Sequence, residues 1–284
     1  MLILGSTQVN ADLLRWEWTA GDVYEITLRS TADIAVTAGE NKLRFKNEII
    51  VTGQWTVVEF KSGGAARLEW QVRRVQVNPN AEEGQLRVDT EVVAKTQEQK
   101  TLQAMLRGLL MKRFQLSVSD TARLGQIKEV RQDSVVSEGL SVDKPVSGSE
   151  VKVPQIFDSE GVARAFKHVF IQFPVDAIEV GAIWKLPNAP EKIREATAYK
   201  FLGSNPQGPE ISFTSDIRFE DGSGAEVEVK KQQLEGNVFF NTVEQFIEKV
   251  VVRLEIETIT DDDGQQIHVL HKESNVIELK KLLR

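Results

Sequence analysis

The stretch that decides the fold is GDVYEITLRSTADIAV, residues 21–36. Apolar side chains occupy every second position from Tyr24 to Val36 except Ser30, and most of the side chains between them are polar. Successive side chains of a β-strand point to opposite faces, so this period of two predicts a strand with one buried face. The chain enters this strand through a Gly-Asp pair, which is typical of a turn.

The same alternation recurs along most of the chain. Glycine accepts the positive φ of tight turns, so KSGGAA at 61–66 predicts a hairpin. A phase slip at Arg73-Arg74 predicts a β-bulge. Short turns between strands favour antiparallel meanders over crossovers. The further strands are expected at residues 43–57, 68–77, 86–94, 114–118, 126–131, 211–219, 250–256 and 265–279.

Two helices interrupt the strands. One carries a stripe of Leu and Met from Leu102 to Leu110, with Thr96 and Gln99 spaced as a capping box. The other begins at Asp158 or Ser159 and directs Val162, Phe166 and Val169 inward.

Two sequence matches indicate an internal duplication. Gly181-Ala-Ile-Trp resembles Gly21-Asp-Val-Tyr at an offset of 160 residues, and FEDGSGAEVEV from Phe219 resembles FKSGGAARLEW from Phe60 at an offset of 159. We therefore expect a mainly β (β-rich α+β) fold of two similar antiparallel meander units, each with a strongly curved sheet and a short helix. The expected boundaries are a signal-peptide remnant at 1–11, repeats at 12–131 and 158–284, and a connector at 132–157.

Composition excludes several classes. The chain of 284 residues has a net charge of −7 and no cysteine, which excludes disulfides, thiolate nucleophiles and a lipidated cysteine and argues against nucleic-acid binding. No apolar run approaches the ~18 residues of a transmembrane helix. Val9-Asn-Ala11 fits the small-residue pattern of a signal-peptidase site. We expect an exported protein of the periplasm or cell envelope, with a cytoplasmic protein as the alternative.

Motifs for catalysis are missing from the sequence. It contains no Gly-x-Ser-x-Gly, no phosphate-binding glycine loop and no dinucleotide fingerprint. His268 and His271 lie three apart on an expected strand, so they face opposite sides and do not share a metal. Asp261–Asp263 departs from a calcium loop and fits a solvated hairpin tip. We expect no cofactor, no metal and no catalytic residue, although paired carboxylates for glycoside hydrolysis stay open.

The motifs Gly-Asp-x-Tyr at 21, Gly-x-hydrophobic-Trp at 181 after FPVDAIEV, and DGSGAEVEV at 221 resemble an uncharacterised family of exported, β-rich bacterial proteins, a domain of unknown function. The resemblance covers most of the chain from residue 16 onward. It implies export and brings no activity and no catalytic residues. The missing lipobox cysteine puts a lipid anchor in doubt.

These observations favour a non-catalytic exported protein that binds a protein or cell-envelope component. A carrier of an apolar small molecule or lipid is the alternative, and a carboxylate-based hydrolase is a weaker one. Aromatic and leucine side chains are the candidate ligand contacts, with core packing as the competing interpretation. A carrier needs an open inner face lined by apolar side chains, whereas a scaffold has that face filled. The candidate contacts are Trp55, Trp70, Trp184, Leu102 and Leu106.

Overall fold

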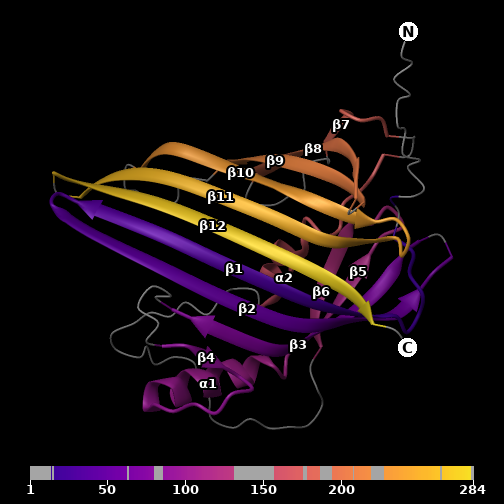
Figure 1. Ribbon diagram of the computed structural model, residues 1–284, viewed down its shortest axis with the longest axis horizontal. Coiled ribbons are helices and arrows are strands. Elements are labelled where there is room, and N and C mark those ends of the chain that lie inside the picture. The colour runs from indigo at the N-terminus through magenta and orange to yellow at the C-terminus, as the bar shows by residue number, and fades with distance from the viewer. Residues whose placement is uncertain are drawn as a thin grey trace.

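The computed structural model shows a mainly β protein, as the sequence predicts, and its described residues form one large antiparallel sheet and two short helices (Figure 1). The sheet has twelve strands, in the order β6-β5-β3-β2-β1-β12-β11-β10-β9-β8-β7, and β4 pairs with β3. The structure describes residues 14, 16–62, 64–79, 86–130, 157–174, 178–185, 194–206, 208–218, 227–262 and 264–282.

The elements follow one another as a meander in which strands adjacent in sequence mostly pair. They are β1 (Val23–Ala38), β2 (Asn41–Phe60), β3 (Ala66–Asn78), β4 (Val88–Asp89), α1 (Gln97–Leu109), β5 (Arg113–Val118), β6 (Leu124–Val130), α2 (Ser159–Phe166), β7 (Ile183–Lys185), β8 (Arg194–Asn205), β9 (Gly208–Arg218), β10 (Val227–Asn241), β11 (Phe246–Asp262) and β12 (Gln265–Leu282).

Strands β1 and β12 pair along all 16 residues of β1 and join the two halves of the chain at the middle of the sheet. Several local predictions are confirmed: Arg73 bulges out of the β2–β3 ladder, and Thr96 and Gln99 form the capping box of α1. The strand predicted over 86–94 is shorter, because only β4 pairs with β3.

The first sequence match corresponds to a repeated turn. Gly21 and Gly181 have φ of 85° and 89°. Gly21 N donates to Val57 O at 2.7 Å, and Gly181 N donates to Phe201 O at 2.8 Å, so the same bond ties each turn to the strand after next. The second match falls differently. If β7 and β8 correspond to β1 and β2, then the β2–β3 hairpin should correspond to the β8–β9 hairpin. The matching residues 219–226 instead separate β9 from β10, so the second match lies one hairpin later, and these residues are outside the described ones.

The sheet curls around α2 and the segment after it. Phe166 lies 4.7 Å from the ring of Trp55 on β2 and 5.2 Å from Trp70 on β3. Two residues later, His168 stacks on Phe213 of β9 at 4.2 Å. In a flat sheet β3 and β9 would be about 29 Å apart, six spacings of about 4.8 Å. The sheet must therefore be strongly curved for both strands to reach one short segment, and β6 and β7 are the two ends of its described strand order.

An aromatic cluster completes the core at this end of the sheet. Trp16 and Trp18 stack at 4.4 Å, and both also pack against Tyr24. Both indoles are buried, and both residues precede β1 in the chain. Among the described helices none is long and apolar enough to cross a membrane.

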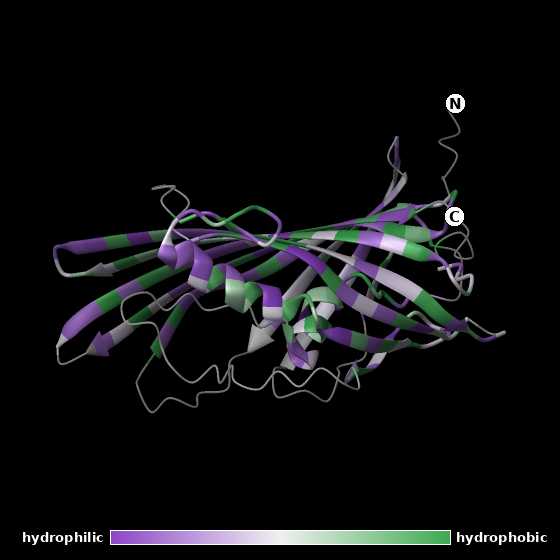
Figure 2. Cartoon of the chain, turned by 90° about the horizontal axis from the view of Figure 1, so that it is seen from below, coloured by the Kyte–Doolittle hydropathy of each residue, from purple (hydrophilic) through white to green (hydrophobic). Residues whose placement is uncertain are grey.

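The core fills only one end of the long strands. Tyr24, Ile26 and Leu28 are buried on β1, whereas residues 31–38 of the same strand are only half-buried. Green and purple alternate along the strands in Figure 2, so the two-residue pattern continues beyond the core. The hairpin tips of β1–β2 and β11–β12 extend past α2, which packs at the other end.

Candidate functional site

The two faces of the sheet are distinguished by the core. We call the face that carries Tyr24, Ile26 and Leu28, and that packs on the aromatic cluster, the inner face, and the opposite one the outer face. Strand alternation and the pairing registers then place every residue of the central strands on one face or the other.

Beyond the core, the inner face is apolar and partly uncovered. The alternation predicts Leu43 and Phe45 on the apolar face of β2, but their side chains are 59% and 45% exposed. Phe45 pairs with Ile34, and Leu43 pairs with Val36. We call this part of the sheet the open inner surface. It comprises Ile34, Val36, Leu43, Phe45, Leu254, Ile256, Val269, His271 and Glu273.

A polar stripe on β12 crosses this apolar surface. Asn275 Nδ2 donates to Glu273 Oε1 at 2.7 Å. His271 Nε2 lies 3.7 Å from Glu273 Oε2, which is beyond hydrogen-bond reach. His271 Nε2 is itself buried and has no hydrogen-bond partner among the described residues. The stripe thus holds donors and acceptors that the protein only partly satisfies.

Beyond the core end, Glu273 holds the one charge at the described inner positions of the five central strands. Lys281 also faces inward, but it lies at the core end, opposite Tyr24. Inner positions alternate along 24–38 of β1, 43–57 of β2, 232–240 of β10, 250–260 of β11 and 267–279 of β12, and none of the others holds Asp, Glu, Lys or Arg. The residues opposite Glu273 on the two neighbouring strands are Ala32 and Leu254.

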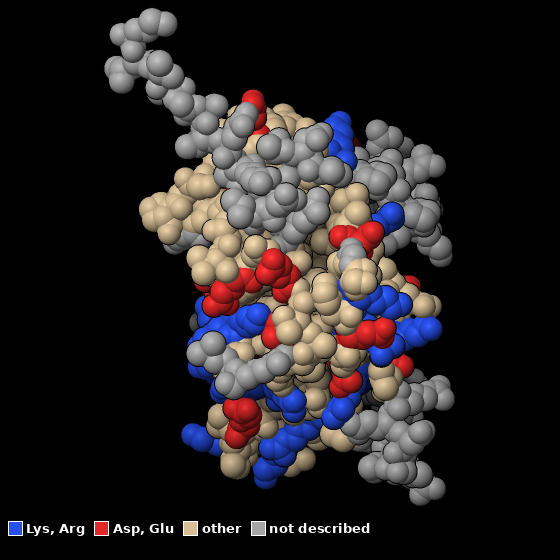
Figure 3. Space-filling view, turned by 90° about the vertical axis from the view of Figure 1, so that its right-hand side faces the viewer, with Lys and Arg blue, Asp and Glu red and all other residues tan. Residues whose placement is uncertain are grey.

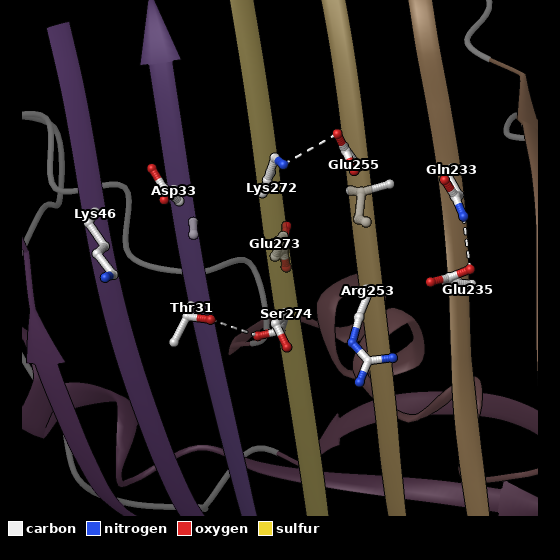
Figure 4. A pocket seen from close by; sticks show the side chains of 12 residues that line it. Thr31, Asp33, Lys46, Gln233, Glu235, Arg253, Glu255, Lys272, Glu273 and Ser274 are labelled. Carbon is white, nitrogen blue, oxygen red and sulfur yellow. Dashed lines mark hydrogen bonds and ion pairs between the residues drawn. The ribbon is translucent and has the colours of Figure 1, made fainter.

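The outer face of the same strands is polar and forms a shallow groove of about 350 Å³ (Figure 4). Two rows of side chains cross these strands, one from β2 to β10 and the other from β1 to β10. In Figure 4, Lys272 and Ser274 stand in front of the β12 ribbon, which covers Glu273. One row is Lys46, Asp33, Lys272, Glu255 and Gln233, and the other is Thr31, Ser274, Arg253 and Glu235.

Charges along this groove largely neutralise one another. Glu255 pairs with Lys231 at 3.0 Å and with Lys272 at 3.4 Å, and the hydrogen bond from Lys231 lowers the Glu255 pKa. Arg44 pairs with Asp33 through two hydrogen bonds and lowers its pKa. On the end of the molecule seen in Figure 3, acidic and basic side chains are likewise interspersed.

The five candidate contacts lie away from the open inner surface. Trp55 and Trp70 are in the core against Phe166, with 0% and 3% exposure. Leu102 and Leu106 are buried on the inward side of α1. Trp184 stacks on the ring of Tyr199 at 5.7 Å and donates from Nε1 to a backbone carbonyl at 3.1 Å. Each has core neighbours that account for its position, so ligand contact by these residues stays a prediction.

The remaining sequence candidates are structural where they are described. His268 lies on the outer face and His271 on the inner, so the two face opposite sides as predicted. Asp261 Oδ1 accepts from Gly264 N at 2.8 Å and shapes the hairpin tip. The described part of the chain has no group of three or more side chains able to hold a metal ion. Glu273 is the carboxylate of the open inner surface, and glycoside hydrolysis by paired carboxylates stays a prediction.

Sequence reasoning missed Glu273. The segment HKESNVI at 271–277 is polar at five consecutive positions, so its alternation does not show which side chains face inward. Counting back in steps of two from the apolar Ile277 and Leu279 assigns residues 275, 273 and 271 to the inner face. The shared face of these odd-numbered positions is the sequence signal that could have identified the polar stripe.

None of the curated proteins compared with the chain matches it. Among solved structures it is similar to DynF from the dynemicin biosynthesis pathway of Micromonospora chersina, at 8% identity over 98% of this chain and 87% of that chain, with a TM-score of 0.24. A TM-score this low supports no argument about function. The family model of DUF6263, a family of unknown function, matches residues 63–241, more than half of the chain. The protein therefore belongs to the DUF6263 family.

Proposed function

We propose that this protein is a non-catalytic binding protein that carries an apolar or amphipathic small molecule on its open inner surface. The observation that carries the proposal is the exposure of Leu43 and Phe45 on the face that forms the core further along the same strands. Contiguous exposed apolar side chains cost free energy in water and commonly mark a binding site.

The curvature of the sheet favours a slender ligand over a folded partner. At the core end, β3 and β9 both contact the segment from Phe166 to His168, so the inner side is about one packed layer deep, roughly 10 Å. A hydrocarbon chain or a flat ring system fits such a space, whereas a second globular domain does not. Export to the periplasm or cell envelope is part of the proposal and is supported by the family resemblance.

The test uses the full chain, the neutral dye N-phenyl-naphthylamine and two matched variants. Phe45→Asp places a charge on the open inner surface, and Lys46→Asp places the same charge one residue away on the outer face. We expect the dye to brighten with the wild type and Lys46→Asp, and Phe45→Asp to bind at least about tenfold more weakly, since burying a Phe contributes about 2 kcal/mol. Circular dichroism checks that both variants fold.

Native mass spectrometry of the purified protein provides the second measurement. A co-purified small molecule, displaced by the dye, supports the proposal. Equal dye binding by Phe45→Asp and Lys46→Asp would overturn it. So would a dimer that blocks the dye, because a second copy would then be the occupant of this surface.

The outer groove favours a second candidate, the binding of a protein or cell-envelope component. Its two rows of hydrogen-bonding and charged side chains suit a polar partner, and Arg253 is exposed there. Binding to isolated envelope fragments that is lost in Arg253→Glu and retained in Phe45→Asp would support this function. Loss in Phe45→Asp alone would refute it.

A further inference from the structure

We propose that Glu273 selects amphiphiles with an amine group, so that the protein prefers apolar amines to apolar acids. This inference rests on the proposed function and names the ligand class of the open inner surface. The motivating observation is that Glu273 is the one Asp, Glu, Lys or Arg among the residues of the open inner surface.

The carboxylate of Glu273 has one oxygen engaged and one available. Oε1 accepts the hydrogen bond from Asn275 at 2.7 Å, which fixes the orientation of the group. Oε2 lies 3.7 Å from His271 Nε2 and has no hydrogen bond from a described residue. The Glu273 side chain is 28% exposed, so a ligand can reach it without displacing the core.

Few described side chains near this carboxylate can pair with it. Ala32 and Leu254 flank it on the neighbouring strands and offer no donor from their side chains. Lys272, the adjacent residue in sequence, points to the outer face and pairs with Glu255 at 3.4 Å. A carboxylate bordered by apolar side chains favours a hydrogen-bonding or charged partner, and Asn275 and His271 are the described side chains with polar atoms placed beside it.

A ligand ammonium supplies the missing partner. Hydrogen bonds between an ammonium and a carboxylate are stronger than neutral ones, and a partly desolvated site strengthens them further. A fatty acid or an anionic phospholipid would place a second negative charge beside Glu273, which costs free energy. The apolar surface runs from Ala32 to Ala38 on β1, about 20 Å at 3.3 Å per residue, so an alkyl chain can lie along it while its amine meets Glu273.

The experiment compares decylamine, decanol and decanoate, which share one chain length, as competitors of N-phenyl-naphthylamine below their micelle-forming concentrations. For the wild type we expect decylamine to compete at least about tenfold better than decanol, corresponding to roughly 1.4 kcal/mol, and decanoate to compete worst. Glu273→Gln keeps the shape of the side chain and should bring decylamine to within about threefold of decanol. Glu255→Gln removes an outer-face carboxylate on the next strand and should leave the order unchanged.

The outcomes separate the two proposals. If decanol displaces the dye but the amine shows no advantage, or keeps it in Glu273→Gln, the role of Glu273 is refuted and the carrier function stands. If none of the three displaces the dye, both proposals fail. Glu273→Leu provides an independent check, since it should improve decanol binding and abolish the preference for the amine; a retained preference would also refute the inference.

Discussion

Two Arg–Asp pairs with the same chemistry and different burial allow a quantitative prediction. Arg74 Nη2 and Nε donate to the two oxygens of Asp89 at 2.5 and 3.1 Å. Asp89 also accepts from Gln76 Nε2 at 2.7 Å and from the Glu91 backbone at 3.0 Å, and its side chain is 9% exposed. The hydrogen bonds from Arg74 depress the Asp89 pKa strongly, with Gln76 adding to the effect.

The expected loss for Asp89→Asn follows from this geometry. Breaking a fully buried ion pair costs about 3–5 kcal/mol. The Arg74 side chain is 37% exposed and can regain hydration, so we expect about 2–3 kcal/mol. For a chain of 284 residues the unfolding entropy is about 0.6 kcal/mol per degree, and the Tm should fall by about 3–5 °C.

The matched control is Asp33→Asn. Arg44 Nη2 and Nε bind the two oxygens of Asp33 at 2.6 and 2.9 Å, but these side chains are 58% and 29% exposed. Exposed pairs contribute about 0–1 kcal/mol, so the Tm should change by at most about 2 °C. Thermal unfolding followed by circular dichroism measures both variants. Equal Tm shifts in the two variants would refute the argument that burial decides the magnitude.

The pH dependence of the Tm provides a second test of the role of Asp89. The folded-state pKa of Asp89 is depressed, so its stabilisation is fully present above the unfolded pKa of about 3.9 and is lost as the pH falls through the folded value. The Tm gap between wild type and Asp89→Asn should therefore be constant from neutral pH to about 4.5 and shrink below that. A gap that closes near neutral pH would contradict the assignment.

Two further predictions concern the core. The indole of Trp70 occupies the space that a side chain at Gly53 would need, so Gly53→Ala should lower the free energy of unfolding by about 1–3 kcal/mol, measured by chemical unfolding. Gly108 on α1 has open space around it, so Gly108→Ala should raise stability slightly. Equal effects of the two substitutions would contradict this prediction. Burial raises the pKa of Tyr24 far above its usual value. The contribution of the neutral phenol to folding stability is therefore complete below about pH 10 and is lost as the pH rises further. Above about pH 10 the Tm of Tyr24→Phe should fall less steeply with pH than that of the wild type, and parallel curves would refute the effect.

The sequence predicted the parts of the fold that depend on local pattern. Alternation located β1, β2, β3, β9, β11 and β12 but not β8 or β10, the phase slip located the bulge at Arg73, and the Thr96 spacing located the start of α1. These features depend on side chains within a few residues of one another. The pairing of β1 with β12 joins residues more than 200 positions apart, and no local pattern specifies it.

The candidate site depended on that long-range pairing. Alternation assigned Leu43 and Phe45 to the apolar face correctly, but burial also requires another layer over that face. The aromatic segment that supplies this layer, Phe166 to Phe173, packs on the core end of the strands and leaves the tips without it. The sequence shows the apolar face of the strands and the aromatic segment separately. Only the fold shows that the aromatic segment covers this face at one end of the strands and not at the tips.

This arrangement separates stability from recognition along the same strands. At the core end Trp55 packs against Phe166 and Phe170, and substitutions there disturb many contacts. At the tips the shape is held by backbone pairing, which continues to Ala38 opposite Asn41 and does not depend on side-chain identity. A carboxylate such as Glu273 would be strongly destabilising beside Trp55, but it is tolerable on a half-exposed surface. The open inner surface is therefore the part of the sheet where side chains can be selected for a ligand with little cost to folding.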